Sequence, residues 1–270
     1  MNTKTWIPED IPLDRPSPAR IYDYMLDGHH NFEVDRLMAE KVLEIHPGAR
    51  LGAQVCRAFL RRAVHFLITQ GIEQILDLGS GIPTAGNVHE VAHKVNPATR
   101  VVYVDIDPIA VAHSRAMLKD NPNATAIQGD ARRLDRILAH EEVKDLLDFS
   151  QPVAALFLLI LHVISDDEEA YGAVCTLRDA LAPGSYIAIS HGTRENAPPG
   201  VIEQLEKLGA GSPNPPRYRS RAEILQFFDG LELVEPGLVY MPLWRPEGPD
   251  DVFFDEPEQS LGFGGVGRKP

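Results

Sequence analysis

The chain has 270 residues, 44% of them hydrophobic, which is enough for one large buried core. Its formal net charge of −13 disfavours tight nonspecific binding to nucleic acid, because such binding depends on Lys and Arg side chains that neutralise phosphates. The two cysteines, Cys56 and Cys175, show neither a disulfide framework nor a metal-binding spacing. Met1–Pro18 lacks the apolar segment of a signal peptide, and the longest apolar run, Val153–Leu161, is too short to cross a membrane, so we expect a cytoplasmic protein.

The N-terminal part of the chain is predicted to be an irregular arm followed by helices. Prolines prevent a regular helix in the first 18 residues. Helical patterns then run from Ala19 to Glu44, with a break at Gly28, and from Val55 to Thr69. We therefore assign residues 1–55 to an arm and helical cap and residues 56–270 to the main domain, the two forming a single globular unit.

From Gln74 onward, strand-like and helix-like segments alternate, which predicts a mostly parallel sheet with helices on both faces. The expected strands are Gln74–Leu78, Arg100–Asp105, Thr125–Gln128, Val153–Leu161 and Tyr186–Ser190. The expected helices are Asn87–Val95, Pro108–Leu118, Arg133–Ala139 and Glu168–Leu181, and Glu141–Asp148 is an acidic stretch.

The C-terminal part follows a different pattern. We expect a helix at Ser220–Phe228, strand-like segments at Leu231–Val234 and Leu238–Leu243, and an acidic, Pro-rich loop at Glu247–Glu258. Taken by its residues alone, Gly262–Arg268 fits either a last strand or a frayed tail.

The most informative segment is Ile75–Thr84, where an apolar strand turns into a helix through Gly79-x-Gly81. Such a turn lets the backbone approach a ligand closely, and the helix N-terminus presents free N–H groups. A dinucleotide site would have a third glycine where this chain has Thr84, so the pattern favours S-adenosylmethionine. Asp77 would then face the cationic amine of the methionine moiety. A plain tight turn, with Asp77 as a helix cap, is the alternative.

Polar residues at the carboxyl ends of the other strands are candidate ligands, because open α/β sheets bind ligands there. Asp105 ends the second strand and would accept hydrogen bonds from a ribose diol, whereas Asp107, directly before a proline, fits a turn or helix cap better. Asp130 follows the third strand and would accept a hydrogen bond from an adenine amino group or cap a helix. His162 and His191 follow the next two strands, and each is a candidate general base or an ordinary structural histidine.

Together, Asp77, Gly79-x-Gly81, Asp105 and Asp130 resemble the cofactor site of the class I S-adenosylmethionine-dependent methyltransferases, over roughly Phe59–Leu243. Segments along nearly the whole chain are similar to a bacterial S-adenosyl methyltransferase family once catalogued as a domain of unknown function. These segments are Pro18–Gly28, Asn31–Arg36, Phe59–Ala63, Asn87–Glu90, Leu181–Ser185 and Gly264–Lys269. The chain departs from this family at His29 and His30, where a Lys-Asp pair is usual, so no role is carried over to them.

This resemblance implies a Rossmann-like, seven-stranded methyltransferase sheet, mostly parallel, with an antiparallel last strand at Gly264–Lys269 and an N-terminal helical cap. It implies S-adenosylmethionine as cofactor and S-adenosylhomocysteine as product. As a separate mechanistic hypothesis, the N-terminal helices would form a lid over the site, with Arg20 pairing with the cofactor carboxylate and an aromatic residue against the sulfonium. The candidate lid contacts are Arg20, Tyr22, Tyr24, Asn31 and Phe32, although Tyr22 and Phe32 fit a core role nearly as well. The expected cofactor-binding set is Arg20, Tyr22, Asp77, Gly79, Ser80, Gly81, Asp105, Ile106, Asp130, Ala131 and Leu159.

The expected function is transfer of a methyl group, by in-line displacement, to a small-molecule acceptor. Leu159–His162 lacks the Asn/Asp-Pro-Pro-aromatic motif of base-amino methyltransferases, which disfavours DNA as the substrate. Arg57, Arg61 and Arg62 are the best candidate for a basic patch, but they fit the solvated face of a helix better. An NAD(P)-dependent oxidoreductase and a non-catalytic S-adenosylmethionine-binding protein are the alternatives. The sequence indicates neither the acceptor nor the oligomeric state.

Overall fold

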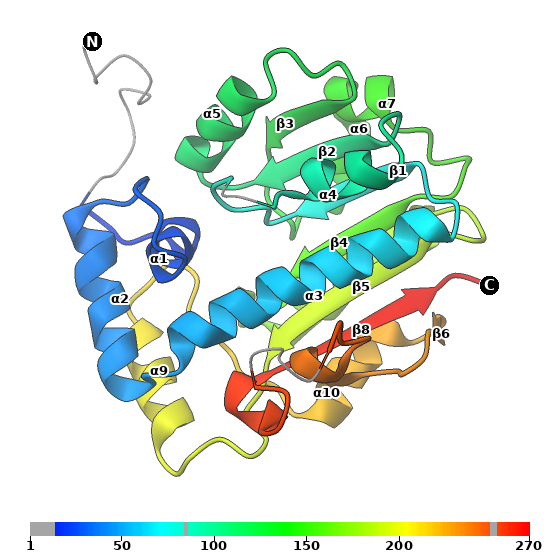
Figure 1. Ribbon diagram of the computed structural model, residues 1–270. Helices are drawn as coiled ribbons and strands as arrows, with labels where there is room; N and C mark the ends of the chain where they lie inside the picture. The colour runs from blue at the N-terminus through cyan, green and yellow to red at the C-terminus, as the bar shows by residue number, and fades with distance from the viewer. Residues whose placement is uncertain (1–13, 84–85, 249–252) are drawn as a thin grey trace.

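The described part of the chain folds around one sheet of eight strands, with helices on both of its faces (Figure 1). The structure is a computed structural model that describes residues 14–83, 86–248 and 253–270. The strands are β1 (Gln74–Leu78), β2 (Arg100–Asp105), β3 (Ala124–Gln128), β4 (Ala154–Leu158), β5 (Tyr186–Gly192), β6 (Glu232–Leu233), β7 (Val239–Tyr240) and β8 (Gly262–Arg268).

The helices belong to an N-terminal group, to the crossovers between strands and to the C-terminal part. They are α1 (Pro18–Met25), α2 (Glu33–Ile45), α3 (Ala49–Thr69), α4 (Val88–Val95), α5 (Pro108–Met117), α6 (Leu134–Ala139), α7 (Glu141–Leu146), α8 (Asp167–Ala180), α9 (Val201–Gly209) and α10 (Arg221–Leu225). Short 3-10 helices are η1 (Leu161–Val163), η2 (Gln226–Phe228), η3 (Met241–Leu243) and η4 (Pro257–Ser260).

The strand order is β3-β2-β1-β4-β5-β8-β6, and β7 pairs with β8 off this path. The pairs among β1 to β5 are parallel, whereas β8 runs antiparallel to β5, β6 and β7. This confirms the predicted mostly parallel sheet with an antiparallel last strand. The sheet has one strand more than the predicted seven because both short segments, β6 and β7, pair with the C-terminal strand. Since β1 to β4 run in the same direction, their carboxyl ends meet at one edge.

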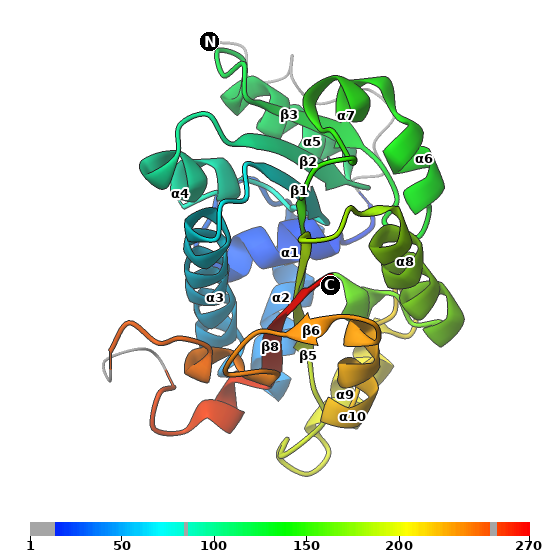
Figure 2. The same cartoon turned by 90° about the vertical axis from the view of Figure 1, so that its right-hand side faces the viewer.

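Two hydrophobic cores sandwich the sheet, as Figure 2 shows with the sheet between its helices. One core packs α3, α4 and α5 against one face, and the other packs α6, α7, α8 and α10 against the opposite face. The glycines of β8 fit this packing closely. A Cβ added to Gly264 would lie 2.8 Å from the ring of Phe59. The antiparallel strand therefore approaches α3 more closely than a larger residue would allow.

Several elements differ from the sequence-based prediction. The apolar run Val153–Leu161 is a strand only over β4, after which the chain turns into η1. The acidic stretch contains helix α7, and α9 lies in a segment where we expected no helix. The boundary expected at residue 55 falls inside α3, a continuous helix that contacts both the N-terminal helices and the sheet. Most of the N-terminal arm, Thr84 and residues 249–252 of the predicted acidic loop lie outside the described residues.

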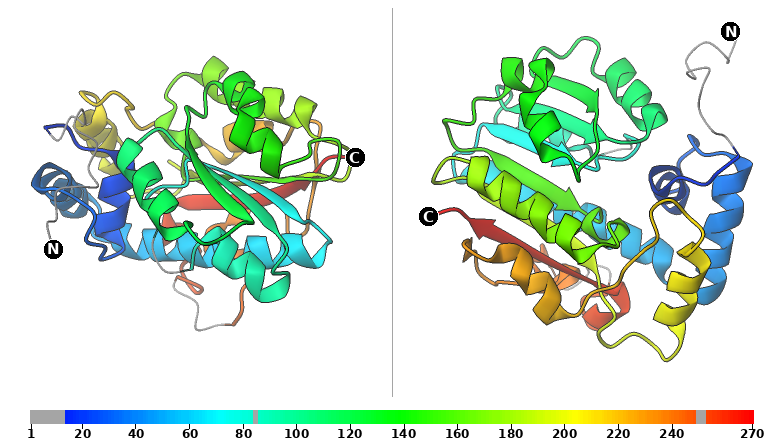
Figure 3. Two further views of the ribbon diagram at one scale, coloured as in Figure 1. Left: turned by 90° about the horizontal axis from the view of Figure 1, so that it is seen from above. Right: turned by 180° about the vertical axis from the view of Figure 1, so that it is seen from behind.

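Helices α1, α2 and α9 gather at the end of the sheet toward which β4 and β5 point (Figure 1). The view from behind shows α9 beside α2, and residues of the two helices are in contact (Figure 3). This arrangement covers the carboxyl ends of the strands. No helix among the described residues is long and apolar enough to cross a membrane.

Candidate active site

A cavity of about 380 Å³ lies between the strand ends and the covering helices. The lining comes from the segments that follow β1, β2, β3 and β4 and from α1, α2, α3 and α9. All of the residues expected to bind the cofactor line this cavity except Arg20. The tertiary structure thus brings together residues between Tyr22 and Leu159 that are far apart in the sequence.

The turn after β1 forms an open cradle at the strand ends. Gly79 and Gly81 have φ angles of +70° and +69°, in the left-handed region that favours glycine. The N–H groups of Gly79 and Ser80 donate to the Val104 carbonyl at 2.8 and 3.1 Å, which ties the turn to β2. A Cβ added to Gly79 would lie 2.6 Å from Ile160, whereas one added to Gly81 would meet no atom of the described residues within 4 Å. The backbone at Gly81 therefore faces open space that a ligand can enter.

Asp105 holds this cradle together. Its carboxylate accepts hydrogen bonds from the N–H of Gly81 at 2.7 Å and from the N–H of Asp107 at 2.8 Å. Burial raises the pKa of Asp105 to about 6, although these backbone hydrogen bonds act in the opposite direction. Asp107 caps α5 by accepting from the N–H of Ile109 at 2.8 Å, which confirms its predicted role as a cap.

Asp77 is the second buried carboxyl group in the cavity. Burial raises its pKa to about 7, against the opposing charge of Arg57 and with a further increase from Asp105. A cationic group bound here would offset the desolvation of both carboxylates. At the third strand end, Asp130 forms a bidentate ion pair with Arg132, with nitrogen–oxygen distances of 2.9 and 2.7 Å. Burial raises the pKa of Asp130, but the hydrogen bonds and charge of Arg132 outweigh it, so the pKa is lowered.

Arg20 is not among the residues that line the cavity. Its Nε lies 3.3 Å from Oδ2 of Asp107 and 3.6 Å from Oδ1 of Asp35, and its guanidinium lies over the ring of Phe32. Arg20 therefore joins α1 to α2 and to the start of α5. Its buried Nη1 has no hydrogen-bond partner among the described residues, and its pairing with a cofactor carboxylate stays a prediction. Tyr22, on the same helix, does line the cavity, and its hydroxyl donates to the Ala53 carbonyl at 3.1 Å.

The two candidate histidines lie in different environments. His162 lines the cavity, and its buried Nδ1 has no hydrogen-bond partner among the described residues. Burial, together with the charge of Arg219, lowers the pKa of His162 to about 4, so the ring is neutral at pH 7.

His191 does not line the cavity. Its Nδ1 lies 2.6 Å from the Gly192 carbonyl and its Nε2 lies 2.9 Å from Nη1 of Arg219. Because a carbonyl only accepts and a guanidinium only donates, Nδ1 carries the proton and Nε2 accepts. With both ring nitrogens occupied, His191 has none free for a substrate, which leaves His162 as the candidate base.

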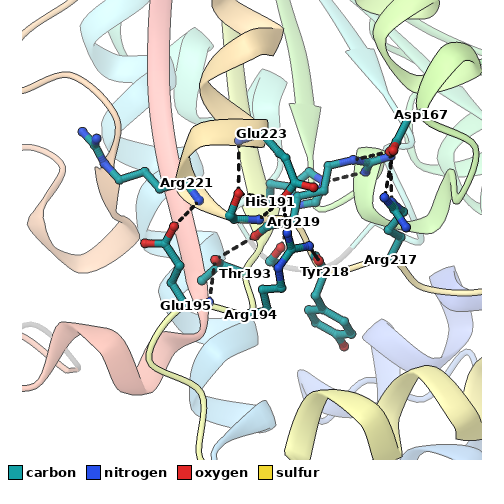
Figure 4. A network of polar contacts seen from close by, with 12 residues as sticks. Asp167, His191, Thr193, Arg194, Glu195, Arg217, Tyr218, Arg219, Arg221 and Glu223 are labelled. Carbon is teal, nitrogen blue, oxygen red and sulfur yellow. Dashed lines mark hydrogen bonds and ion pairs between the residues drawn. The ribbon is translucent and has the colours of Figure 1, made fainter.

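A buried arginine, Arg219, holds the turn that carries His162 (Figure 4). Its five N–H groups have acceptors in His191, Asp167, and the carbonyls of Leu161 and Ile164. The backbone N–H of Arg217 donates to the His162 carbonyl at 2.7 Å. Local sequence patterns do not reveal this network, because arginines in a polar loop resemble solvated residues.

The prediction that Arg57, Arg61 and Arg62 form a solvated face of α3 is wrong for two of the three residues. Arg62 is buried and donates to the carbonyls of Trp244 and Met241, both at 2.8 Å. Arg57 lines the cavity and donates to the Gly86 carbonyl at 2.7 Å. Only Arg61 lies at the surface, where it is 3.5 Å from Glu247.

The strand order is that of an α/β methyltransferase. The glycine turn after β1, hydrogen-bonded to Asp105 at the end of β2, is also typical of this class. A model of the family described as S-adenosyl methyltransferase matches residues 4–270, so the chain belongs to this family. A methyltransferase candidate from Thermobifida fusca YX is 41% identical with a TM-score of 0.90, and the match covers 98% of this chain and 99% of that one. A DUF574 family protein from Streptomyces avermitilis MA-4680 is 36% identical with a TM-score of 0.90, and the match covers 96% of this chain and 99% of that one.

More distant structures share the fold alone. The mitomycin 7-O-methyltransferase MmcR is 15% identical with a TM-score of 0.51, over 82% of this chain and 56% of that one. No curated protein matches the sequence. The family and the fold identify the protein as an S-adenosylmethionine-dependent methyltransferase, which confirms the expected class of enzyme over the nicotinamide-dependent alternative.

Proposed function

We propose that the cavity binds S-adenosylmethionine along the ends of β1, β2 and β3, and that the methyl acceptor is a small molecule bound beside it. The observation that carries this proposal is the hydrogen bond between the N–H of Gly81 and Asp105, which joins the open glycine turn to the second strand end in one cavity. The cradle at Gly81 and the two buried carboxyl groups fit a cofactor with a cationic amine and a ribose.

The proposed contacts follow the order of the strand ends. The turn Gly79–Gly81 lies against the methionine part, and Asp77 faces its amine. Asp105 accepts from the ribose hydroxyls, since its two backbone hydrogen bonds leave a lone pair on each oxygen. Asp130 accepts from the adenine amino group. Tyr22, Ser80, Ile106, Ala131 and Leu159 complete the lining on the faces of the cofactor.

When bound, S-adenosylmethionine supplies a methyl group on a sulfonium sulfur that is already activated for displacement. The protein then has to orient the acceptor, exclude water and receive a proton if the acceptor loses one. Helices α1 and α2 cover the strand ends and limit the access of water. His162 lines the cavity and is neutral at pH 7, so its ring can accept a proton from an acceptor hydroxyl, although the burial that lowers its pKa also weakens it as a base.

A small molecule is the acceptor class that the covering helices support, because residues of α1, α2 and α9 line the cavity and restrict the space beside the strand ends. The net charge of −13 disfavours a nucleic-acid substrate. Both cysteines are free thiols, which agrees with the reducing cytoplasm, the location that we propose.

Titration calorimetry with S-adenosylmethionine tests the cofactor site. We expect the wild type to bind, and Asp105→Ala to weaken binding by about 1–3 kcal/mol, because a buried acceptor for the ribose is lost. Asp120→Ala, which removes an exposed carboxylate beyond α5, serves as the matched control and should bind like the wild type. A wild type that fails to bind, or an Asp105→Ala variant that binds equally well, would overturn the assignment.

A further inference from the structure

The charged residues that line the cavity are confined to one side of it. Asp77, Asp105, Asp130 and Arg132 follow the strands, and Arg57 of α3 interacts electrostatically with Asp77. We call the opposite part, which lies under α2 and α9, the acceptor chamber. Its lining residues include Met38, Val42, Leu205, Leu208, Tyr218 and Leu261.

The helices of the acceptor chamber contain many charged residues and turn them away from the cavity. Neither α2 nor α9 contributes an Asp, Glu, Lys or Arg to the described lining, although α2 alone contains Glu33, Asp35, Arg36, Glu40, Lys41 and Glu44. Instead, α2 presents Met38 and Val42, and α9 presents Leu205 and Leu208. The uncharged surface is therefore a property of how these helices pack against each other.

The titratable groups of the chamber are neutral as well. Burial, reinforced by Glu206, raises the pKa of Tyr218 to about 12, so its hydroxyl stays protonated. Burial lowers the pKa of His46, and burial with the charge of Arg219 lowers that of His162. An ionised acceptor would lose its hydration here without meeting an opposite charge, which costs several kcal/mol.

We propose that the acceptor chamber selects an uncharged, mostly apolar small molecule with a hydroxyl group, which it presents to His162. This inference rests on the proposed function, because it assigns the chamber to the acceptor of the same cavity. An aliphatic amine is protonated at neutral pH and would need a carboxylate, and the chamber offers none among its described lining residues. A hydroxyl group enters without charge and needs only a base at the edge of the chamber.

The transfer step balances with the groups already named. The acceptor oxygen forms a bond to the methyl carbon, and the carbon–sulfur bond breaks with its electron pair left on sulfur. The hydroxyl proton passes to a ring nitrogen of His162, whose side chain lines the cavity. No oxidant or reductant takes part.

Three naphthalene probes of similar size test the selectivity: neutral 2-naphthol, anionic 6-hydroxy-2-naphthoate and cationic 2-(aminomethyl)naphthalene. Binding of each is measured by calorimetry, and methyl transfer by the formation of S-adenosylhomocysteine. We expect 2-naphthol to bind at least tenfold more tightly than either ion and to be the better acceptor. Preference for either ion would overturn the inference.

A matched pair of variants on α9 locates the binding. Leu208→Glu adds a negative charge to the chamber lining, and Gln204→Glu adds the same charge on the exposed side of the helix. We expect Leu208→Glu to weaken 2-naphthol binding at least tenfold and Gln204→Glu to change it less than twofold. Equal effects of the two variants would overturn the inference.

Titration with S-adenosylmethionine separates this inference from the proposed function. Both variants should bind the cofactor like the wild type, which also shows that they fold. Cofactor binding combined with a preference for a charged probe would contradict the acceptor class alone. Failure of the wild type to bind S-adenosylmethionine would overturn the proposed function, and with it the assignment of the chamber.

Discussion

Individual buried residues determine the electrostatics of the cavity. Asp77 and Asp105 have raised pKa values because burial disfavours their charged forms, and His162 has a lowered pKa for the same reason. The side of the cavity at the strand ends thus holds carboxyl groups whose charged forms a bound cation would stabilise, whereas a neutral histidine lies beside the acceptor chamber. Opposite roles arise from one physical cause, because desolvation always favours the neutral form.

Replacing His162 tests its role as a base. We expect His162→Gln to lower kcat by about 10²–10⁴-fold with a hydroxyl acceptor, since a glutamine amide cannot take up the proton. The affinity for S-adenosylmethionine should change less than threefold. Initial rates at saturating cofactor provide the measurement, with His191→Gln expected to act mainly through stability because His191 does not line the cavity. Unchanged kcat in His162→Gln would refute a base role.

The raised pKa values of Asp77 and Asp105 predict a pH dependence. Protonation near pH 7 and 6 removes the negative charge that attracts the cofactor, so binding of S-adenosylmethionine should weaken as the pH falls from about 8 to about 5. Without cofactor the sign is reversed. A carboxyl whose pKa is higher when folded contributes stability below its unfolded pKa, and this stability is lost as the pH rises through the folded value.

Asp77→Asn separates these two effects. The variant should weaken cofactor binding at pH 8, yet raise the free energy of unfolding of the cofactor-free protein there by about 1–3 kcal/mol. Calorimetric titration and thermal unfolding at pH 5 and pH 8 measure both quantities. Cofactor affinity that is equally pH-dependent in the wild type and the variant would exclude Asp77 as its source.

At the scale of elements, the site depends on segments that hold one another in place. The turn η1 carries His162, and Arg217 and Arg219 hold it by donating to the carbonyls of Leu161 and His162 and to that of Ile164 directly after it. Arg219 also lies over the ring of Phe227 at 5.4 Å. The segment before α10 therefore positions a residue that follows β4.

Arg219→Lys tests this support, because lysine keeps the charge but has only three N–H donors on one atom. We expect kcat to fall at least tenfold while the affinity for S-adenosylmethionine changes less than threefold, since the strand-end side is untouched. Arg219→Met should lower the free energy of unfolding by about 3–5 kcal/mol, because several buried acceptors lose their partner. Arg136→Met, an exposed arginine on α6, is the control. A purely structural role would leave kcat of the folded Arg219→Lys variant unchanged.

At the scale of the whole molecule, the N-terminal helices close the cavity and are tied to the sheet domain by buried ions. Arg20 of α1 lies between Asp35 of α2 and Asp107 at the start of α5. His30, in the loop before α2, packs its ring 4.0 Å from that of His113 on α5. The cap is therefore attached at the same strand end that holds the proposed ribose contact.

Arg20→Met would leave Asp35 buried without its cation, and we expect it to lower the free energy of unfolding by about 3–5 kcal/mol. Denaturant unfolding provides the measurement. Cofactor affinity of the folded variant should fall less than fivefold, because Arg20 does not line the cavity. A loss of a hundredfold or more would instead support the predicted pairing of Arg20 with the cofactor carboxylate.

The parallel strands, the glycine turn and the polar strand ends follow from local sequence patterns. Asp107 before Pro108 signals a helix cap, and Gly79-x-Gly81 signals a turn, because these properties depend on neighbouring residues. The residues of Gly262–Arg268 alone fit either a strand or a frayed tail. The family resemblance added the prediction that Gly264–Lys269 forms an antiparallel last strand. The observed sheet therefore has one strand more than the predicted seven, because both of the short strand-like segments pair with β8.

Contacts between distant segments decided which arginines are buried and where the uncharged acceptor chamber forms. Arg219, Arg62 and Arg20 are all buried cations, and the sequence cannot reveal this because their acceptors lie far away along the chain. Likewise, only the packing of α9 against α2 creates an uncharged chamber from two helices rich in charged residues. Local patterns determine which segments form strands, helices and turns, whereas burial and hydrogen-bond partners depend on which of these segments meet in space.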